Sequence, residues 1–219
     1  SGFLQGLRDE CRRVGALLVF DEVITGFRVA TGGAQQVTGV AADLTTFGKV
    51  IGGGLPIGAV GGRRDVMETL TPLGTVFHAG TLAGNPLATA AGRAALDELT
   101  PDAYALLGRR ARRLADGLTE ACAAAGFPGR FTSVHTLVGM FFGEALAGDA
   151  WPTNFAEATS TDEAAYRRFF HAMLAEGVAL PPGAYEALFV GLGHTDEVID
   201  EILVRAQRAA RAAATPGGV

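Results

Sequence analysis

Lys49 is the residue of this sequence with the clearest capacity for chemistry. It is the single lysine among the 18 basic residues, and it lies in the apolar, glycine-bounded segment 44–58. A lysine amine can lose its proton and attack a carbonyl carbon, whereas an arginine guanidinium stays charged. An arginine-rich chain can also retain one ordinary surface lysine. Residue type and context therefore leave a nucleophilic role and a plain surface role equally open.

A carboxylate, Asp21, follows the apolar run at residues 16–20. We expect this run to be a strand buried on both faces of a parallel sheet. We expect residues 43–47 to form a second strand that leads directly to Lys49. Ligands of open α/β sheets bind beyond the carboxyl ends of strands, so Asp21 and Lys49 could share one edge. The alternative is that Asp21 and Glu22 are loop acids that cap the next element.

The elements that must position these residues follow from apolar spacing and from glycine and proline positions. Pro86 suits the first turn of a helix, with Asn85 or a neighbour as its cap. In the first part of the chain we expect helices at 3–14 (ended by Gly15), 63–70 and 86–125 with an interruption near Pro101, a glycine-rich loop at 31–39 and a third strand at 57–60.

The pattern changes to α+β beyond the glycine- and proline-containing segment 126–129. Ser160 and Glu163 have the spacing of a capping box, and Thr195 precedes an amphipathic run with acids in its first turn. Here we expect strands at 137–142, 178–180 and 187–192, and helices at 162–176 and from Thr195 onwards.

Composition and motif tests exclude several classes of function. The net charge of −5, without a basic block, argues against nucleic acid or an anionic membrane as partner. The two cysteines are far apart, which predicts no metal site or disulfide framework and a cytoplasmic location. No apolar run has membrane-spanning length. Val50 follows Gly48 and Lys49 where a P-loop needs a hydroxyl residue.

Three separated segments resemble the class III pyridoxal-phosphate (PLP) aminotransferases: residues 20–28 (FDEVITGFR), 47–56 (FGKVIGGGLP) and 79–86 (AGTLAGNP). Within that family the resemblance is closest to the branch that isomerises glutamate-1-semialdehyde to aminolevulinate. The resemblance implies that Lys49 forms a Schiff base with PLP and then moves protons, and that Asp21 pairs with the pyridinium nitrogen. It further implies that Val23 packs on one face of the cofactor ring.

The remaining site residues are also implied by the resemblance. Gly80 and Thr81 would reach the cofactor phosphate across a dimer interface, and Glu186 would lie near the amino groups of a small amine or carbonyl substrate. Residues 182–186 read PGAYE, where the family usually has serine at the second position. This departure leaves open a class III transaminase that acts on another amine or carbonyl substrate. A non-catalytic dimerising fragment is the third alternative.

The fold that the resemblance implies is α/β. Residues 1–100 would be the C-terminal part of a PLP fold type I large domain, with a mostly parallel sheet and helices. Residues 101–126 would be a connecting helix, and residues 127–219 a smaller α+β C-terminal domain. The family is about twice this long, and the chain resembles its C-terminal half. We therefore expect a homodimer, or a complex with a polypeptide that carries the N-terminal half.

Overall fold

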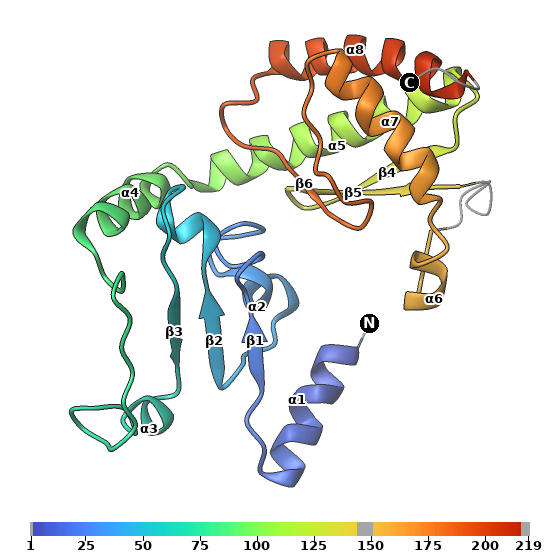
Figure 1. Ribbon diagram of the computed structural model, residues 1–219. Coiled ribbons are helices and arrows are strands. Elements are labelled where there is room, and N and C mark those ends of the chain that lie inside the picture. The colour runs from blue at the N-terminus through green and yellow to red at the C-terminus, as the bar shows by residue number, and fades with distance from the viewer. Residues whose placement is uncertain (1, 144–150, 216–219) are drawn as a thin grey trace. The chain divides into compact units, whose positions relative to one another are not determined.

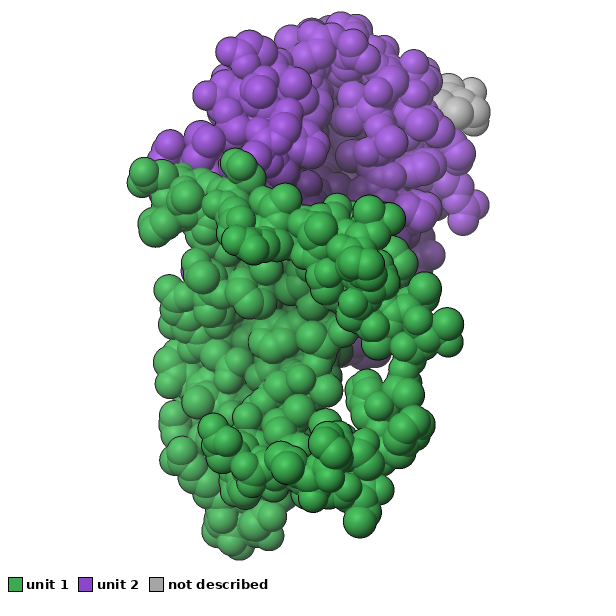
Figure 2. All heavy atoms as spheres, turned by 90° about the vertical axis from the view of Figure 1, so that its left-hand side faces the viewer, with its two compact units in different colours: residues 1–104 green, residues 105–219 purple. Residues whose placement is uncertain are grey.

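The computed structural model describes residues 2–143 and 151–215 (Figure 1). The chain forms two compact units, Ser1–Tyr104 and Ala105–Val219, which are coloured separately in Figure 2. The boundary falls inside helix α5 (Pro101–Ala124), in the region expected to be a connecting helix. The α/β fold class is confirmed, while the assignment of large and small domains stays a prediction.

The first unit is built on a three-stranded sheet of order β1-β2-β3 (β1 Val19–Asp21, β2 Leu44–Phe47, β3 Ala59–Gly62). Strands β1 and β2 are parallel, with Asp21 opposite Thr46, but β3 runs antiparallel to β2. The expected burial of the first strand on both faces is wrong. Val19 is 51% exposed, so the face of β1 on which it lies is not covered.

Most helix signals in the first unit are confirmed. Helix α1 (Phe3–Val14) ends at Gly15, which has the left-handed conformation with φ 72°. Helix α4 (Pro86–Asp97) begins with its proline, and the Asn85 side chain accepts a hydrogen bond of 2.9 Å from Ala88 N–H. The short helix α3 (Arg64–Met67) and the 3₁₀-helix η1 (Lys49–Gly52) complete this part. The expected loop at 31–39 is wrong in part, because helix α2 (Gly33–Thr38) lies inside it.

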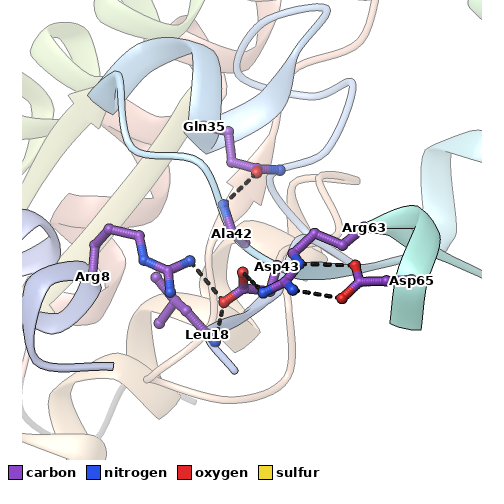
Figure 3. A network of polar contacts seen from close by, with 7 residues as sticks. All are labelled: Arg8, Leu18, Gln35, Ala42, Asp43, Arg63 and Asp65. Atoms are coloured by element: carbon purple, nitrogen blue, oxygen red, sulfur yellow. Dashed lines mark hydrogen bonds and ion pairs between the residues drawn. The ribbon is translucent and has the colours of Figure 1, made fainter. Parts of the chain in front are cut away.

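Charged residues attach α1 to the sheet (Figure 3). Arg8 is only 6% exposed and pairs with Asp43, its Nη1 lying 2.7 Å from Oδ2. The same oxygen accepts the Leu18 N–H at 2.8 Å, and Oδ1 accepts from Arg63 Nη1 at 3.1 Å. Phe3, on the apolar stripe of α1, is 75% exposed. The buried contact of this helix is therefore an ion pair and not its apolar stripe.

Acid is expected to weaken the first unit through Asp43. The Leu18 N–H and then the Arg8 guanidinium lower the pKa of Asp43 from 3.8 to about 2. A carboxyl whose folded-state pKa is depressed stabilises the fold above its unfolded-state pKa and loses that contribution as pH falls through the folded-state value. The urea concentration at the midpoint of unfolding should therefore decrease as the pH is lowered from about 4 to about 2. The Asp43→Asn variant should have a lower urea midpoint than the parent at neutral pH, and its midpoint should decrease less over this pH range. An equal loss in both proteins would contradict this role.

The second unit contains an antiparallel sheet of order β4-β5-β6 (β4 Gly129–Val134, β5 Leu137–Phe142, β6 Leu188–Phe189). Phe131 and Phe142 of this sheet pack against Phe169, with ring centroids 6.0 and 5.7 Å from the Phe169 ring. Phe169 belongs to helix α7 (Glu163–Ala175), which also packs on helix α8 (Asp196–Ala214). Strand β5 has the predicted bounds.

Other expectations for the second unit need correction. Residues 178–180 are not a strand, and the strand expected at 187–192 is reduced to β6. Strand β4 and the short helix α6 (Phe155–Ala158) had no counterpart in the predicted elements. The cap of α7 is Asp162 and not Ser160, because the Asp162 side chain accepts from Ala165 N–H at 2.9 Å. Helix α8 begins next to Thr195, where a helix was predicted to start, and the Thr195 side chain caps it.

Candidate active site

The structure brings Asp21 and Lys49 to the same edge of the first sheet. Asp21 is the last residue of β1, and Lys49 begins the 3₁₀-helix that follows β2. Because β1 and β2 are parallel and Asp21 lies opposite Thr46, both strands present their carboxyl ends at this edge. This is the edge at which open α/β sheets bind ligands. Both side chains are exposed to solvent.

Two hydrogen bonds orient the Asp21 carboxylate. Oδ1 accepts the Val23 N–H at 3.0 Å and the Thr46 hydroxyl at 3.1 Å. Within the part of the chain that the structure describes, Oδ2 accepts no hydrogen bond. One oxygen therefore anchors the side chain while the other can accept a proton donor. Thr46 was not among the candidate residues, and only its cross-strand register with Asp21 reveals its role.

The backbone around Lys49 is unusual. Lys49 has φ 50°, in the left-handed region that a residue with a Cβ adopts at a cost of about 1 kcal/mol. Gly48 before it is extended and buried. A Cβ on Gly48 would lie 3.3 Å from Cγ1 of Val23, so Val23 packs directly against the start of this turn. Strained conformations of this kind persist where the surrounding structure enforces them, and they cluster at functional sites.

Helix α4 supports the Lys49 turn by direct contact between backbones. A Cβ on Gly92 would overlap the carbonyl oxygen of Ile51, and a Cβ on Gly53 would overlap that of Ala91. Gly53 also has φ 57°, which favours glycine on its own. Glycines on both sides thus allow α4 and η1 to approach without side chains between them. The position of Lys49 is set by this close packing.

The second acid of the Asp-Glu pair has a structural role. Glu22 is 1% exposed, and its Oε2 accepts the Ala34 N–H at 2.7 Å and the Thr25 hydroxyl at 3.0 Å. Its Oε1 accepts the Gln35 N–H at 3.1 Å. Glu22 therefore holds the start of α2 under the sheet edge, while Asp21 faces solvent. Side chains alternate between the faces of a strand, and this alternation separates the two acids.

The structure does not join the other predicted residues to this edge. Gly80 and Thr81 are exposed and form a turn before α4, in which the Gly80 carbonyl accepts the Ala83 N–H at 3.0 Å. Glu186 belongs to the second unit and is also exposed; its Oε1 accepts the Gly183 N–H at 3.2 Å. Glu186 lines a cavity of about 550 Å³ in that unit.

Two negative findings apply to residues 2–143 and 151–215. In these ranges no group of three or more His, Cys, Asp or Glu side chains is arranged to hold a metal ion. In the same ranges no helix is long and apolar enough to cross a membrane.

Comparison with known proteins gives a match along most of the chain. A family model described as "Aminotransferase class-III" matches residues 1–209. An omega-transaminase from Sphaerobacter thermophilus is 33% identical with a TM-score of 0.75, and 95% of this chain aligns with 48% of that one. A beta-phenylalanine aminotransferase from Variovorax paradoxus is 35% identical with a TM-score of 0.77, and 94% of this chain aligns with 46% of that one.

A third similar structure is a glutamate-1-semialdehyde aminomutase from Pseudomonas aeruginosa, crystallised with PMP. It is 26% identical with a TM-score of 0.77, and 95% of this chain aligns with 47% of that one. The chain thus spans about half the length of the solved structures that it matches.

Proposed function

The chain belongs to the class III aminotransferase family, and from that premise we propose that it is the lysine-bearing part of a PLP-dependent enzyme that transfers amino groups. The observation that carries this proposal is the placement of Asp21 and Lys49 at the carboxyl ends of two adjacent parallel strands. PLP sites combine a Schiff-base lysine with an aspartate or an arginine beside the ring nitrogen, and this edge of the sheet supplies a lysine and an aspartate. The close packing of Gly92 fixes the backbone of the turn that carries this amine.

The side chains present fit this cofactor. Lys49 would hold it through its amine, and Asp21 Oδ2 would accept a hydrogen bond from the protonated ring nitrogen while Thr46 and the Val23 N–H hold Oδ1. Val23 would pack on the ring. When bound, PLP supplies an electron sink that stabilises a carbanion at the substrate carbon. Lys49 would move the proton to and from that carbon, and Asp21 would keep the ring nitrogen protonated.

The remaining assignments also belong to this proposal. Gly80 and Thr81 would bind the cofactor phosphate from a second copy of the chain in a homodimer. Glu186 would pair with the amino group of a small amine or carbonyl substrate. Because the chain spans about half the length of similar structures, we propose that the rest of the fold completes the site, on this or another polypeptide. The enzyme would work in the cytoplasm.

Two forms of amino transfer have specific support. The resemblance of the motifs at residues 20–28, 47–56 and 79–86, together with the match to a solved glutamate-1-semialdehyde aminomutase, supports transfer within one molecule. The identities of 33% and 35% to two transaminases, against 26% to an aminomutase, favour transfer between molecules. In the first case the substrate supplies its own amino group. In the second case a separate donor and acceptor are required.

A donor-requirement assay separates these forms. The completed enzyme, loaded with PLP, would receive glutamate-1-semialdehyde alone, and then panels of donor amines with a keto acceptor. Aminolevulinate formed without a donor identifies the mutase, and turnover strictly dependent on a donor identifies the transaminase. Cofactor absorbance that no amine changes would overturn amino transfer. The non-catalytic alternative would then hold.

A further inference from the structure

A further cavity in the second unit is lined almost entirely by apolar side chains. It has a volume of about 360 Å³, which lies within the range of small-molecule sites. We call it the α5–α8 pocket. Helix α5 contributes Leu114 and Leu118, helix α8 contributes Ile202, and the other walls come from residues 178–181, from β6 with its neighbours and from His194. All of these residues belong to the second unit, which forms the whole pocket.

Helices α5 and α8 form a fixed frame for the pocket. Arg110 Nε of α5 lies 2.9 Å from Asp196 Oδ1 of α8. A Cβ on Gly117 of α5 would overlap the side chain of Leu203 of α8, so the two helices also pack closely two turns further along. The pocket therefore lies beside a helix pair whose spacing is set by an ion pair and by direct packing.

Another wall of the pocket is an apolar segment without regular structure. Residues 178–181 (VALP) belong to no helix or strand. The segment is held near its two ends, because the Val178 N–H donates to the Met173 carbonyl at 2.9 Å and the Pro181 carbonyl accepts the Tyr166 hydroxyl. A molecule that enters beside this segment therefore disrupts no strand pairing.

His194 is the one polar side chain among the described residues that line the pocket. Its Nδ1 accepts the Gly191 N–H at 3.0 Å, and its backbone N–H donates to the Gly191 carbonyl at 3.0 Å. An imidazole nitrogen that accepts a hydrogen bond carries no proton, which places the ring proton on Nε2. Nε2 makes no hydrogen bond with residues 2–143 or 151–215. The lining therefore offers one N–H donor within an apolar surface.

The composition of the lining determines the charge that a ligand can carry. Among the described lining residues there is no Asp, Glu, Lys or Arg. A charged group buried without a partner has a large desolvation cost, whereas an apolar ring gains from burial against side chains such as Leu118 and Val190, each 1% exposed. A cavity of about 150 Å³ is enough to hold benzene. This larger pocket therefore has room for a ring that carries a further polar group.

We propose that the α5–α8 pocket binds an uncharged ring compound with one carbonyl group. The ring would lie against Leu114, Leu118 and Ile202, and the carbonyl oxygen would accept a hydrogen bond from His194 Nε2–H. Binding involves no covalent step. The site is additional to the sheet edge that carries Asp21 and Lys49, and this inference goes beyond the proposed function and does not depend on it.

The test measures binding of three probes to the complete 219-residue chain by NMR titration, without PLP. Methyl benzoate is uncharged and has a carbonyl acceptor, propylbenzene is uncharged and lacks the acceptor, and benzoate is charged. We expect both uncharged probes to bind, and benzoate to bind at least about tenfold more weakly than methyl benzoate. Failure of methyl benzoate to bind would overturn the proposal. A benzoate affinity equal to that of the ester, or higher, would overturn it as well.

Two substitutions at His194 isolate the contribution of its Nε2–H. His194→Asn retains an acceptor for the Gly191 N–H but has no donor at the position of Nε2. This variant should weaken methyl benzoate about fivefold more than propylbenzene, as loss of one hydrogen bond does. His194→Gln, whose amide N–H reaches the position of Nε2, should restore part of this difference. Equal weakening of the ester and the hydrocarbon by His194→Asn would contradict the proposed hydrogen bond.

A larger side chain in the lining tests the position of the ligand. Ile202→Phe in α8 should fill part of the pocket and weaken both uncharged probes. Val204→Phe is the matched control and should weaken neither, because Val204 belongs to the same helix, is 47% exposed and lies outside the lining. Unchanged binding in the Ile202→Phe chain would place the ligand elsewhere and refute the proposal.

The result is independent of the chemistry at Lys49. A Lys49→Ala chain should bind methyl benzoate as the parent does, so failure of the proposed function would not imitate failure of this proposal. The titration is repeated once the rest of the fold is supplied. Retained binding supports the site, whereas loss of binding would show that another segment fills the pocket, and the proposal would then be wrong.

Discussion

Replacing Lys49 by alanine is expected to abolish covalent attachment of PLP and to lower the rate of amino transfer by at least about a thousandfold. Lys49 is the only lysine in the sequence, so no other lysine can substitute for it. Borohydride reduction in the presence of PLP, followed by peptide mass mapping, checks the attachment. The parent protein should carry a pyridoxyl group on Lys49 and the variant should carry none.

Two further variants make this test specific. Lys49→Arg retains the positive charge but cannot form the covalent link. If the amine itself is required, this variant should lose PLP attachment and amino transfer as Lys49→Ala does. Asp21→Asn should keep the attachment and lose most of the rate, because the amide cannot stabilise a protonated ring nitrogen. A pyridoxyl group found elsewhere on the chain, with Lys49 unmodified, would refute the assignment.

Replacing Gly92 by alanine is expected to lower the free energy of unfolding by about 2 kcal/mol, as overpacking of a close contact does. The new methyl group would overlap the Ile51 carbonyl oxygen, so α4 and η1 would have to separate. Urea denaturation of parent and variant measures the effect. The same displacement should slow PLP attachment, because η1 begins at Lys49.

A glycine in another helix provides the matched control. Gly6 lies inside α1, and a Cβ there meets nothing within 4 Å. Alanine is the better helix former, so Gly6→Ala should stabilise the protein by up to about 1 kcal/mol. If Gly6→Ala raises the free energy of unfolding and Gly92→Ala lowers it, the effect of Gly92→Ala comes from its contact with the Ile51 carbonyl oxygen. If both variants gained stability, close packing of α4 on η1 could not be what positions Lys49.

Signals that act within a few residues predicted the local structure well. Gly15 ends α1, Asn85 caps α4, and α8 starts next to Thr195, each where the sequence indicated. Each depends on a side chain or backbone conformation next to the helix end, which a short stretch of sequence contains. The Asp162 cap of α7 shows the limit of such reasoning. Several capping residues stood close together there, and only the geometry selected one.

Contacts between distant residues decided what local signals could not. Helix α2 forms inside a glycine-rich segment because the Glu22 carboxylate accepts the N–H of Ala34, which lies 12 residues further along the chain. The antiparallel direction of β3 follows from pairing with β2 across a glycine-containing turn, and not from apolar pattern. Strand β6 is short because it pairs with the distant strand β5 only at Leu188 and Phe189. Strand β4 was missed although its partner β5 follows it directly.

The sequence by itself indicated which residues are candidates for the chemistry. A single lysine among arginines, an acid after an apolar run and three separated motifs identified the family and its candidate amine and carboxylate. Tertiary structure alone decided that Asp21 faces solvent while Glu22 is buried, that Thr46 orients Asp21, and that the backbone of α4 packs against the Lys49 turn. The reason is physical. Residue type sets the reactivity of a group, whereas its position depends on hydrogen bonds and packing between segments far apart in the chain.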